Sequence, residues 1–264
     1  MKKLLLLLLC VVTLLAADQR DSFKINLGVM NVTNFETELQ LAPKGSPVGA
    51  YINTKDQLNM KNDTNVFRVD GYYRFNETHS IDFSYFSVKS DGLSSGTIEY
   101  DDKNITSGSI SSYFNMDIYK INYGYSFYHN DKVELALTAG FHITAIKLGL
   151  FAYGIVDGKE ATHYRSETSV TAPLPVVGFK GEYTIIKKKL FVNYKADYFF
   201  LSIDKYQGAL ISTSLNCEYR FMNNFGMGIG YNSNNIRLKA NGNNAKVDIH
   251  NTLSGAMIYI SYVH

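Results

Sequence analysis

The chain has 264 residues, of which 45% are hydrophobic, with 26 basic and 24 acidic side chains. The two excess bases are Lys2 and Lys3 in the amino-terminal leader, so the remainder is formally neutral, which argues against nucleic-acid binding. No later segment offers the roughly 18 consecutive apolar residues of a membrane-spanning helix, which excludes a helical membrane protein.

The first element is a leader typical of exported proteins. A charged start, Met1-Lys2-Lys3, precedes the apolar run from Leu4 to Leu15, and Ala16-Ala17 supplies small residues for cleavage. We expect residues 1–17 to be a signal peptide and residues 18–264 to form one domain, since no Pro- or Gly-rich linker divides them. Cys217 is then the one cysteine left, which excludes an intramolecular disulfide.

The rest of the chain alternates apolar and polar residues with a period of two, which places successive side chains on opposite faces of a strand. This pattern predicts strands over residues 23–41, 66–75, 81–90, 113–129, 133–151, 171–186, 190–200, 209–221, 225–231 and 252–263. Short connections are expected at 76–78, 129–132, 187–189, 204–208 and 222–224. Long polar loops are expected at 42–65, 93–111 and 153–169, the first with a short hairpin of its own, and the Asn- and Gly-rich span 232–251 is expected to make a last hairpin excursion.

Short turns that alternate with long loops, and an even number of strands, are typical of an outer-membrane barrel. We therefore predict an all-β fold, a single antiparallel up-and-down transmembrane β-barrel of about ten strands, with eight or twelve left open. The short turns would be periplasmic and the long loops extracellular. Each strand is long enough to cross a bilayer when tilted, which takes roughly 9 to 11 residues.

The two faces of the expected strands differ sharply in chemistry. One face is dominated by large apolar residues such as Tyr119, Ile121 and Tyr123. The other carries small and hydroxyl residues together with six bases and six acids: Arg68, Asp70, Arg74, Asp82, Lys120, Glu134, Lys180, Glu182, Lys195, Asp197, Glu218 and Arg220. On a soluble sheet this would be an ordinary solvated surface, whereas in an exported barrel it predicts a polar lumen of paired charges, with the apolar face turned to lipid.

The segments "RVDGYYRFNETHSIDFSYFSVKSDG", "YKINYGYSFYHNDKVELALTAGFHIT", "TAPLPVVGFKGEY" and "FGMGIGYNS" resemble Gram-negative outer-membrane barrel proteins. The resemblance is to a functionally uncharacterised group similar to the outer-membrane protein A and W barrels. It implies an outer-membrane location among lipid and lipopolysaccharide, and insertion by the barrel-assembly machinery. Such chains usually end in an aromatic residue, whereas this one ends Val263-His264. We expect a monomer.

The strongest catalytic candidate is His142-Ile143-Thr144, because a His two residues before a hydroxyl shares its face of a strand, as a base and a nucleophile require. By parity both side chains point into the lumen, which favours a hydrogen-bonded lumen histidine over catalysis. Asp157 and His163 could form a protease-like pair at the barrel mouth. The remaining histidines are scattered and the acidic segments 54–65 and 101–104 lack the spacing of a calcium loop, so no metal or other cofactor is expected.

Three classes of function follow from these residues. The favoured one is a structural or narrow-pore barrel without catalysis, whose lumen is filled by opposite charges. The first alternative is an outer-membrane barrel enzyme, a lipid hydrolase or protease that uses His142. The second is a secreted lipocalin-like binding protein, which the absence of Trp, of disulfides and of a hydrophobic lumen face disfavours.

Overall fold

The structure, a computed structural model, describes residues 21–43, 50–56, 58–61, 63–100, 103–156, 159–203, 206–241 and 245–264, so the expected signal peptide lies outside the described residues. The strands are β1 (Phe23–Pro43), β2 (Ala50–Asn53), β3 (Thr64–Arg74), β4 (His79–Tyr100), β5 (Lys103–His129), β6 (Val133–Val156), β7 (Lys159–Ile186), β8 (Leu190–Ile203), β9 (Tyr206–Arg220), β10 (Phe225–Asn241) and β11 (Ala245–Val263). In this part of the chain no helix could cross a membrane.

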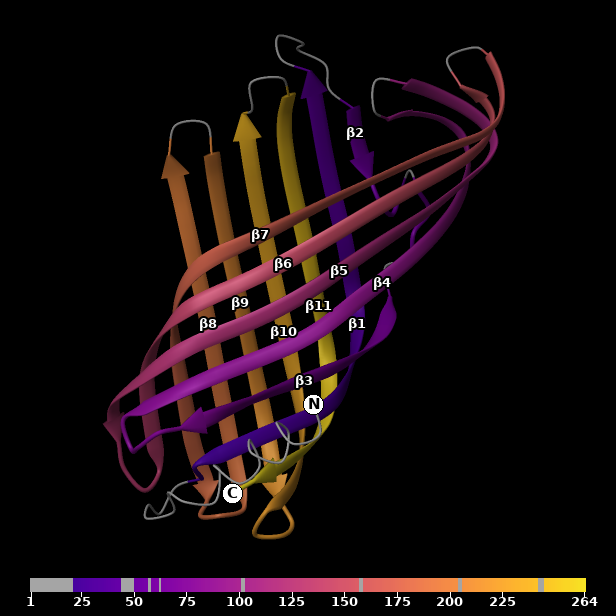
Figure 1. The fold of residues 1–264 in the computed structure, drawn as a ribbon. Helices are drawn as coiled ribbons and strands as arrows, with labels where there is room; N and C mark the ends of the chain where they lie inside the picture. The colour runs from indigo at the N-terminus through magenta and orange to yellow at the C-terminus, as the bar shows by residue number, and fades with distance from the viewer. Residues whose placement is uncertain are drawn as a thin grey trace, which may run out of the picture.

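The strands form a closed antiparallel barrel, which confirms the predicted fold and the count of ten (Figure 1). Each strand pairs with its neighbour in sequence from β3 to β11, and β1 lies between β3 and β11. The last pairing, β1 with β11, runs from Lys24 opposite Val263 to Pro43 opposite Ala245 and closes the ring. The short β2, within the predicted first loop, pairs with residues 38–41 of β1 and not with another part of that loop, so the hairpin differs from the one expected.

The predicted tight turns lie at the end of the barrel that holds both described termini, the lower end in Figure 1. Two of them are fixed by an asparagine side chain. Asn76 accepts hydrogen bonds from the backbone of Thr78 and His79, both at 2.9 Å, and Asn130 accepts from Lys132 and Val133, both at 2.8 Å. An asparagine that bonds backbone groups two and three residues on stabilises a turn, so these positions were readable from sequence.

The long loops predicted at 93–111 and 153–169 are wrong over most of their length, because the described residues there are strand. The hairpin excursion predicted at 232–251 is confirmed, since the upper parts of β10 and β11 pair there. The 27 residues of β5 span roughly 90 Å at about 3.3 Å per residue, far more than a bilayer needs. On β6 and β7 the exposed apolar band ends near Ala145 and Pro173. The next residue on the outer face of β6 is the exposed Lys147. The sequence there reads as loop because the outward face is polar, while the strand itself continues.

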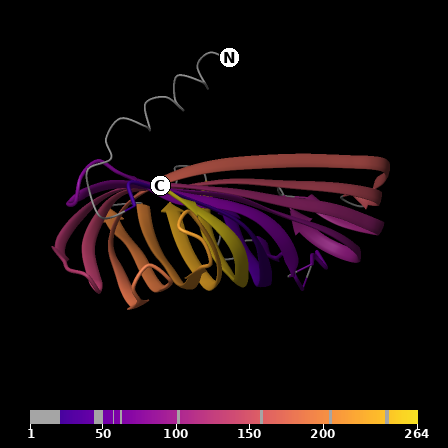
Figure 2. The same cartoon turned by 90° about the horizontal axis from the view of Figure 1, so that it is seen from below.

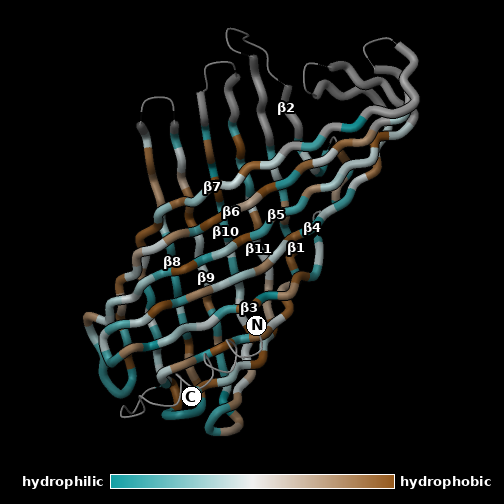
Figure 3. The backbone as a smooth tube through the Cα atoms, viewed as in Figure 1, coloured by the Kyte–Doolittle hydropathy of each residue, from teal (hydrophilic) through white to brown (hydrophobic). Residues whose placement is uncertain are grey.

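The interior of the barrel has two tiers, and Figure 3 shows the alternation of polar and apolar residues along its strands. The lower tier is polar. The upper tier is apolar, with a large cluster that includes Phe35, Phe86, Phe114 and Leu150, and a second cluster of Leu174, Val176, Phe199, Leu210 and Ile236, called here the seam cluster. The expectation that the lumen face lacks hydrophobic residues is therefore wrong for the upper tier, since the apolar residues change faces where the predicted loops begin.

The barrel is not paired all round in its upper half. β7 has 28 residues, yet it pairs with β8 only between Val177 and Ile186. Above Val177 the strands β4 to β7 bend away from β8 to β11 (Figure 1), and from below the strands form two curved layers (Figure 2). The apolar clusters lie between these layers, and the gap in pairing between β7 and β8 is called the seam.

Candidate functional site: the charged lumen

The twelve charged residues singled out in the sequence all project into the barrel, where each is buried or half-buried. Glu218 is fully buried at 0% exposure and Lys180 is 6% exposed. On the opposite face Tyr123 and Tyr194 are 47% and 42% exposed. The parity of each strand thus sends its charges inward and its large apolar side chains outward, as alternation along a barrel strand requires.

Several of the ion pairs cross the lumen between strands that are not neighbours. Arg74 on β3 donates two hydrogen bonds to the carboxylate of Glu134 on β6, at 3.0 and 2.9 Å. Lys180 on β7 lies 3.2 Å from Asp82 on β4, and Asp82 also lies 3.6 Å from Lys195. These contacts brace opposite walls of the barrel against each other.

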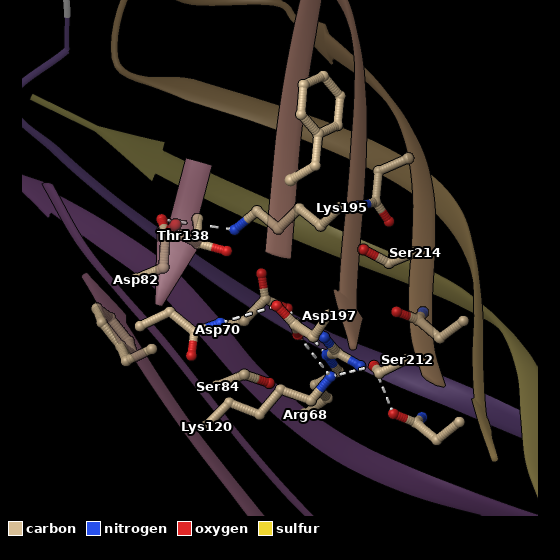
Figure 4. Close-up of a pocket in the computed structure, with 16 residues that line it drawn as sticks. Arg68, Asp70, Asp82, Ser84, Lys120, Thr138, Lys195, Asp197, Ser212 and Ser214 are labelled. Carbon is tan, nitrogen blue, oxygen red and sulfur yellow. Dashed lines mark hydrogen bonds and ion pairs between the residues drawn. The ribbon is translucent and has the colours of Figure 1, made fainter. Parts of the chain in front are cut away.

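A third brace lies in the middle of the barrel, on Lys120 of β5 and Asp197 of β8 (Figure 4). The Lys120 ammonium lies 3.5 Å from the Asp197 carboxylate and donates a hydrogen bond to the Ser212 hydroxyl. Ser212 in turn donates to the side-chain oxygen of Asn234 at 2.7 Å. The network therefore continues from β5 through β8 and β9 to β10.

The lowest layer includes residues that the sequence reading missed. Lys24 on β1 lies 2.5 Å from Glu218 on β9, and the Tyr259 hydroxyl donates to the same carboxylate at 3.3 Å. Arg220 pairs with Asp21 at 2.5 Å and with Glu218 at 3.3 Å. Lys24 and the buried Asn26 lie on one face of β1, and Ile25 and Leu27 lie on the other. This alternation was the signal in the sequence that could have placed Lys24 in the lumen.

Glu182 differs from the other eleven predicted residues. It lies directly opposite Glu134 in the β6–β7 ladder, and among the described residues it forms no ion pair. Arg68 and Asp70 pair with each other along β3 at 3.1 Å, and Asp70 also accepts a hydrogen bond from Asn26 at 2.9 Å. The predicted set is thus brought together in one lumen, although Glu182 is not part of a pair.

A small polar cavity of about 50 Å³ lies within this network. Its walls include three basic residues, three acidic residues and several Ser and Asn side chains (Figure 4), namely Arg68, Lys120, Lys195, Asp70, Asp82, Asp197, Ser84, Asn122, Ser212, Ser214, Asn216, Asn232 and Asn234. At about 10 to 15 Å³ per water, this volume holds only a few water molecules. The cavity is far smaller than an aqueous channel.

His142 and Thr144 lie inside the barrel on β6, at 0% and 2% exposure. In the described part of the chain, the two nitrogens of the His142 ring have no hydrogen-bond partner, and the Thr144 hydroxyl has none either. The two side chains therefore do not bond each other. In the ladders His142 lies between Lys120 on β5 and Leu174 on β7. These groups are costly to bury unpaired.

Two other sequence predictions concern the pair Asp157 and His163 and the absence of a metal site. Asp157 and the side chain of His163 lie outside the described residues. The His129 ring lies 3.3 Å from Glu77 near a turn, and the His79 ring lies 2.5 Å from the Tyr123 hydroxyl on the outer face. Within the described ranges no three His, Cys, Asp or Glu side chains gather into a metal site.

Comparisons with known proteins bear on the fold. No protein-family model and no curated protein matches the chain. Among solved structures, the outer membrane protease OmpT from Escherichia coli is 11% identical, with a TM-score of 0.60, over 93% of this chain and 99% of that one. The translocator domain of autotransporter NalP from Neisseria meningitidis is 11% identical over 99% of this chain and 94% of that one, with a TM-score of 0.48. The likeness to OmpT shows that this chain has the fold of Gram-negative outer-membrane barrels, and confirms that resemblance.

Proposed function

We propose that the chain is a structural barrel of the outer membrane without catalysis, with a lumen closed, or nearly closed, by paired charges. The observation that carries this proposal is the set of ion pairs between strands that are not neighbours, Arg74 with Glu134, Lys180 with Asp82 and Lys120 with Asp197. A barrel that conducts solutes leaves its axis open, whereas these side chains meet across it. The apolar tier above them adds a second, hydrophobic layer.

The energetics of buried pairs support a structural role. Removing one partner of a buried pair costs about 3 to 5 kcal/mol, because the other charge remains in a medium of low polarity. Each cross-lumen pair therefore ties two distant strands in one register. A network of this kind favours a single closed shape of the barrel over the more open arrangements that the same strands could adopt.

The outer face supports the proposed location. It exposes large apolar side chains in a continuous band. Five of them are between 56% and 67% exposed, namely Phe67, Leu137, Val177, Ile229 and Ile258. Such a surface is unfavourable in water and suits hydrocarbon. We include in the proposal export by the signal peptide at residues 1–17, insertion by the barrel-assembly machinery, and a monomer among lipid and lipopolysaccharide.

The absence of catalysis is part of the same proposal. A general base must lie within hydrogen-bond reach of its nucleophile, and His142 has no such partner among the described residues. The enzyme alternative makes a distinct prediction, since His142→Ala would abolish hydrolysis of lipid or peptide by the purified barrel. Our proposal expects no hydrolysis that depends on His142.

Planar-bilayer recording tests the proposal. The purified barrel should show little or no conductance, because ion pairs fill its axis. The double variant Lys180→Ala with Asp82→Ala removes one brace without leaving a charge from that pair, and should raise the conductance. Large steady openings of the unmodified protein would refute the closed lumen.

A further inference from the structure

The seam between β7 and β8 begins where two prolines enter β7. The backbone N–H of Thr184 donates to the Lys132 carbonyl, next to β6, at 2.7 Å. Because backbone N–H groups alternate between the two neighbours along a strand, the odd-numbered residues of β7 point to β8. Pro173 and Pro175 are odd-numbered and carry no N–H, so the ladder to β8 loses both donors beyond Val177.

A second gap in the backbone pairing lies between β3 and β4, and it differs from the seam because another part of the chain fills it. There the β3–β4 ladder ends at Arg68 opposite Phe86, and a connecting segment fills the space above it. Leu58 and Met60 of that segment are 0% and 5% exposed, and Met60 bridges to Gly92 of β4. At the seam, none of the described residues pairs with the free edge of β7 or of β8.

Side chains alone hold the seam together from inside. Leu174 and Val176 of β7 pack in the seam cluster with Phe199 of β8 and Leu210 of β9. A contact between apolar side chains, without backbone hydrogen bonds, opens at a lower free energy than a complete ladder does. On the outer face the seam meets the upper part of the apolar band, where Phe200 is 64% exposed. The seam is thus a weak point that joins the lipid-facing surface to the seam cluster.

The polar cavity lies next to the seam cluster on the inside. Its wall residues Asp197, Ser212 and Asn234 each come two positions before or after a seam-cluster residue on β8, β9 and β10. The path from the lipid through the seam therefore runs first past apolar side chains and then reaches charged ones.

The charged residues that line the cavity are three bases and three acids, and Lys180 joins them through Asp82. Asp82 alone serves two lysines, at 3.2 Å from Lys180 and 3.6 Å from Lys195. Lys180 and Lys195 therefore share one carboxylate.

Two unpaired polar side chains of β6 lie between β5, which carries Lys120, and β7, which carries the seam. His142 and Thr144 are almost completely buried, have no hydrogen-bond partner in the described chain, and flank Leu174 and Ala172 in the β6–β7 ladder. A carboxylate could accept hydrogen bonds from a His N–H, a Thr hydroxyl and a Lys ammonium at once. We propose that the seam admits an anionic single-chain amphiphile, a fatty acid, whose carboxylate binds beside Lys120, His142 and Thr144 and whose chain lies along the seam cluster.

Binding of palmitate to the barrel in lipid nanodiscs, measured by calorimetry, tests the proposal. Methyl palmitate is the matched ligand without charge, and it should bind at least about tenfold more weakly, the equivalent of one lost charge-assisted hydrogen bond. Equal binding of the two ligands, or no binding of palmitate, overturns the proposal and leaves only water at His142 and Thr144.

Two variants locate the site. Thr144→Val keeps the shape of the side chain and removes a hydroxyl that has no partner, so the barrel should remain folded while palmitate affinity falls. The matched control is Thr138→Val, which changes a cavity-wall threonine farther from the seam and should leave the affinity unchanged. An unchanged affinity in Thr144→Val, or equal losses in both variants, contradicts the assignment.

Crosslinking tests the route. A palmitate with a diazirine on its chain should label the seam cluster, above all Leu174 and Leu210, when peptides are analysed by mass spectrometry. Pro173→Val with Pro175→Val restores two backbone donors toward β8 and should reduce this labelling. Labelling confined to outward residues such as Tyr198 and Phe200 would identify ordinary boundary lipid and overturn the proposal.

Discussion

Glu218 offers the sharpest test of the braced lumen. Its carboxylate is fully buried and contacts Lys24 at 2.5 Å, Arg220 at 3.3 Å and the Tyr259 hydroxyl at 3.3 Å. Glu218→Gln keeps the size of the side chain and removes its charge. Arg220 retains Asp21, whereas Glu218 is the one ion-pair partner of Lys24 among the described residues. We expect the variant to lose about 3 to 5 kcal/mol of unfolding free energy, the usual cost of breaking a buried pair.

The assay is urea unfolding of the barrel in lipid vesicles, with the folded fraction read from heat-modifiable migration on gels. A matched control exists at the turns, where Asp131 and Lys187 pair at 3.0 Å with side chains that are 80% and 68% exposed. Asp131→Asn should cost no more than about 1 kcal/mol. The double variant Lys24→Met with Glu218→Gln should recover part of the loss, since it removes the buried cation as well. If Glu218→Gln costs as little as Asp131→Asn, the reasoning about buried braces is wrong.

Two further predictions concern the outer surface. Ile258 on β11 is 67% exposed within the apolar band, so Ile258→Arg should cost roughly 2 to 4 kcal/mol in the same unfolding assay. Thr252→Arg, beyond the band on the same strand, is the control and should cost at most about 1 kcal/mol. Equal costs would contradict the placement of the band. Beyond the band on β7, hydrogen bonds from Arg165, at 2.7 Å, and from Tyr113 hold the pKa of Glu167 below its ordinary value. The stability from this contact is present above the pKa of Glu167 in the unfolded chain and is lost as the pH falls through its lower pKa in the folded chain. In Arg165→Met, NMR titration should show a higher pKa for Glu167. An unchanged pKa would contradict the contact.

The alternation of side chains was enough to predict the barrel and the inward charges. A period of two with Tyr119 on one face and Lys120 on the other assigns every residue of a strand to one side, and Asn76 and Asn130 mark the turns. Which charges would pair was not predictable, because Arg74 and Glu134 are 60 residues apart and meet only after the ring has closed.

The upper half was misjudged for a physical reason. Beyond the bilayer the outward face is polar, so segments around Ile110 and Leu148 show apolar residues on the inward parity and lack the outward apolar pattern that marks a lipid-facing strand. In the predicted strand over residues 171–186, Pro173 and Pro175 would lie near the start, where a missing donor is least harmful. In the structure they lie within β7, at the point where its pairing with β8 stops.

The central claim is that the large apolar side chains face lipid while the charges face the barrel axis. Spin labels on single cysteines at Ile258, Tyr194 and Lys180, in a Cys217→Ser background, test it in reconstituted vesicles. The first two should be relaxed by oxygen, which concentrates in hydrocarbon, and not by a water-soluble nickel chelate, while the label at Lys180 should be shielded from oxygen. Strong relaxation of the Ile258 and Tyr194 labels by the nickel chelate would contradict the account.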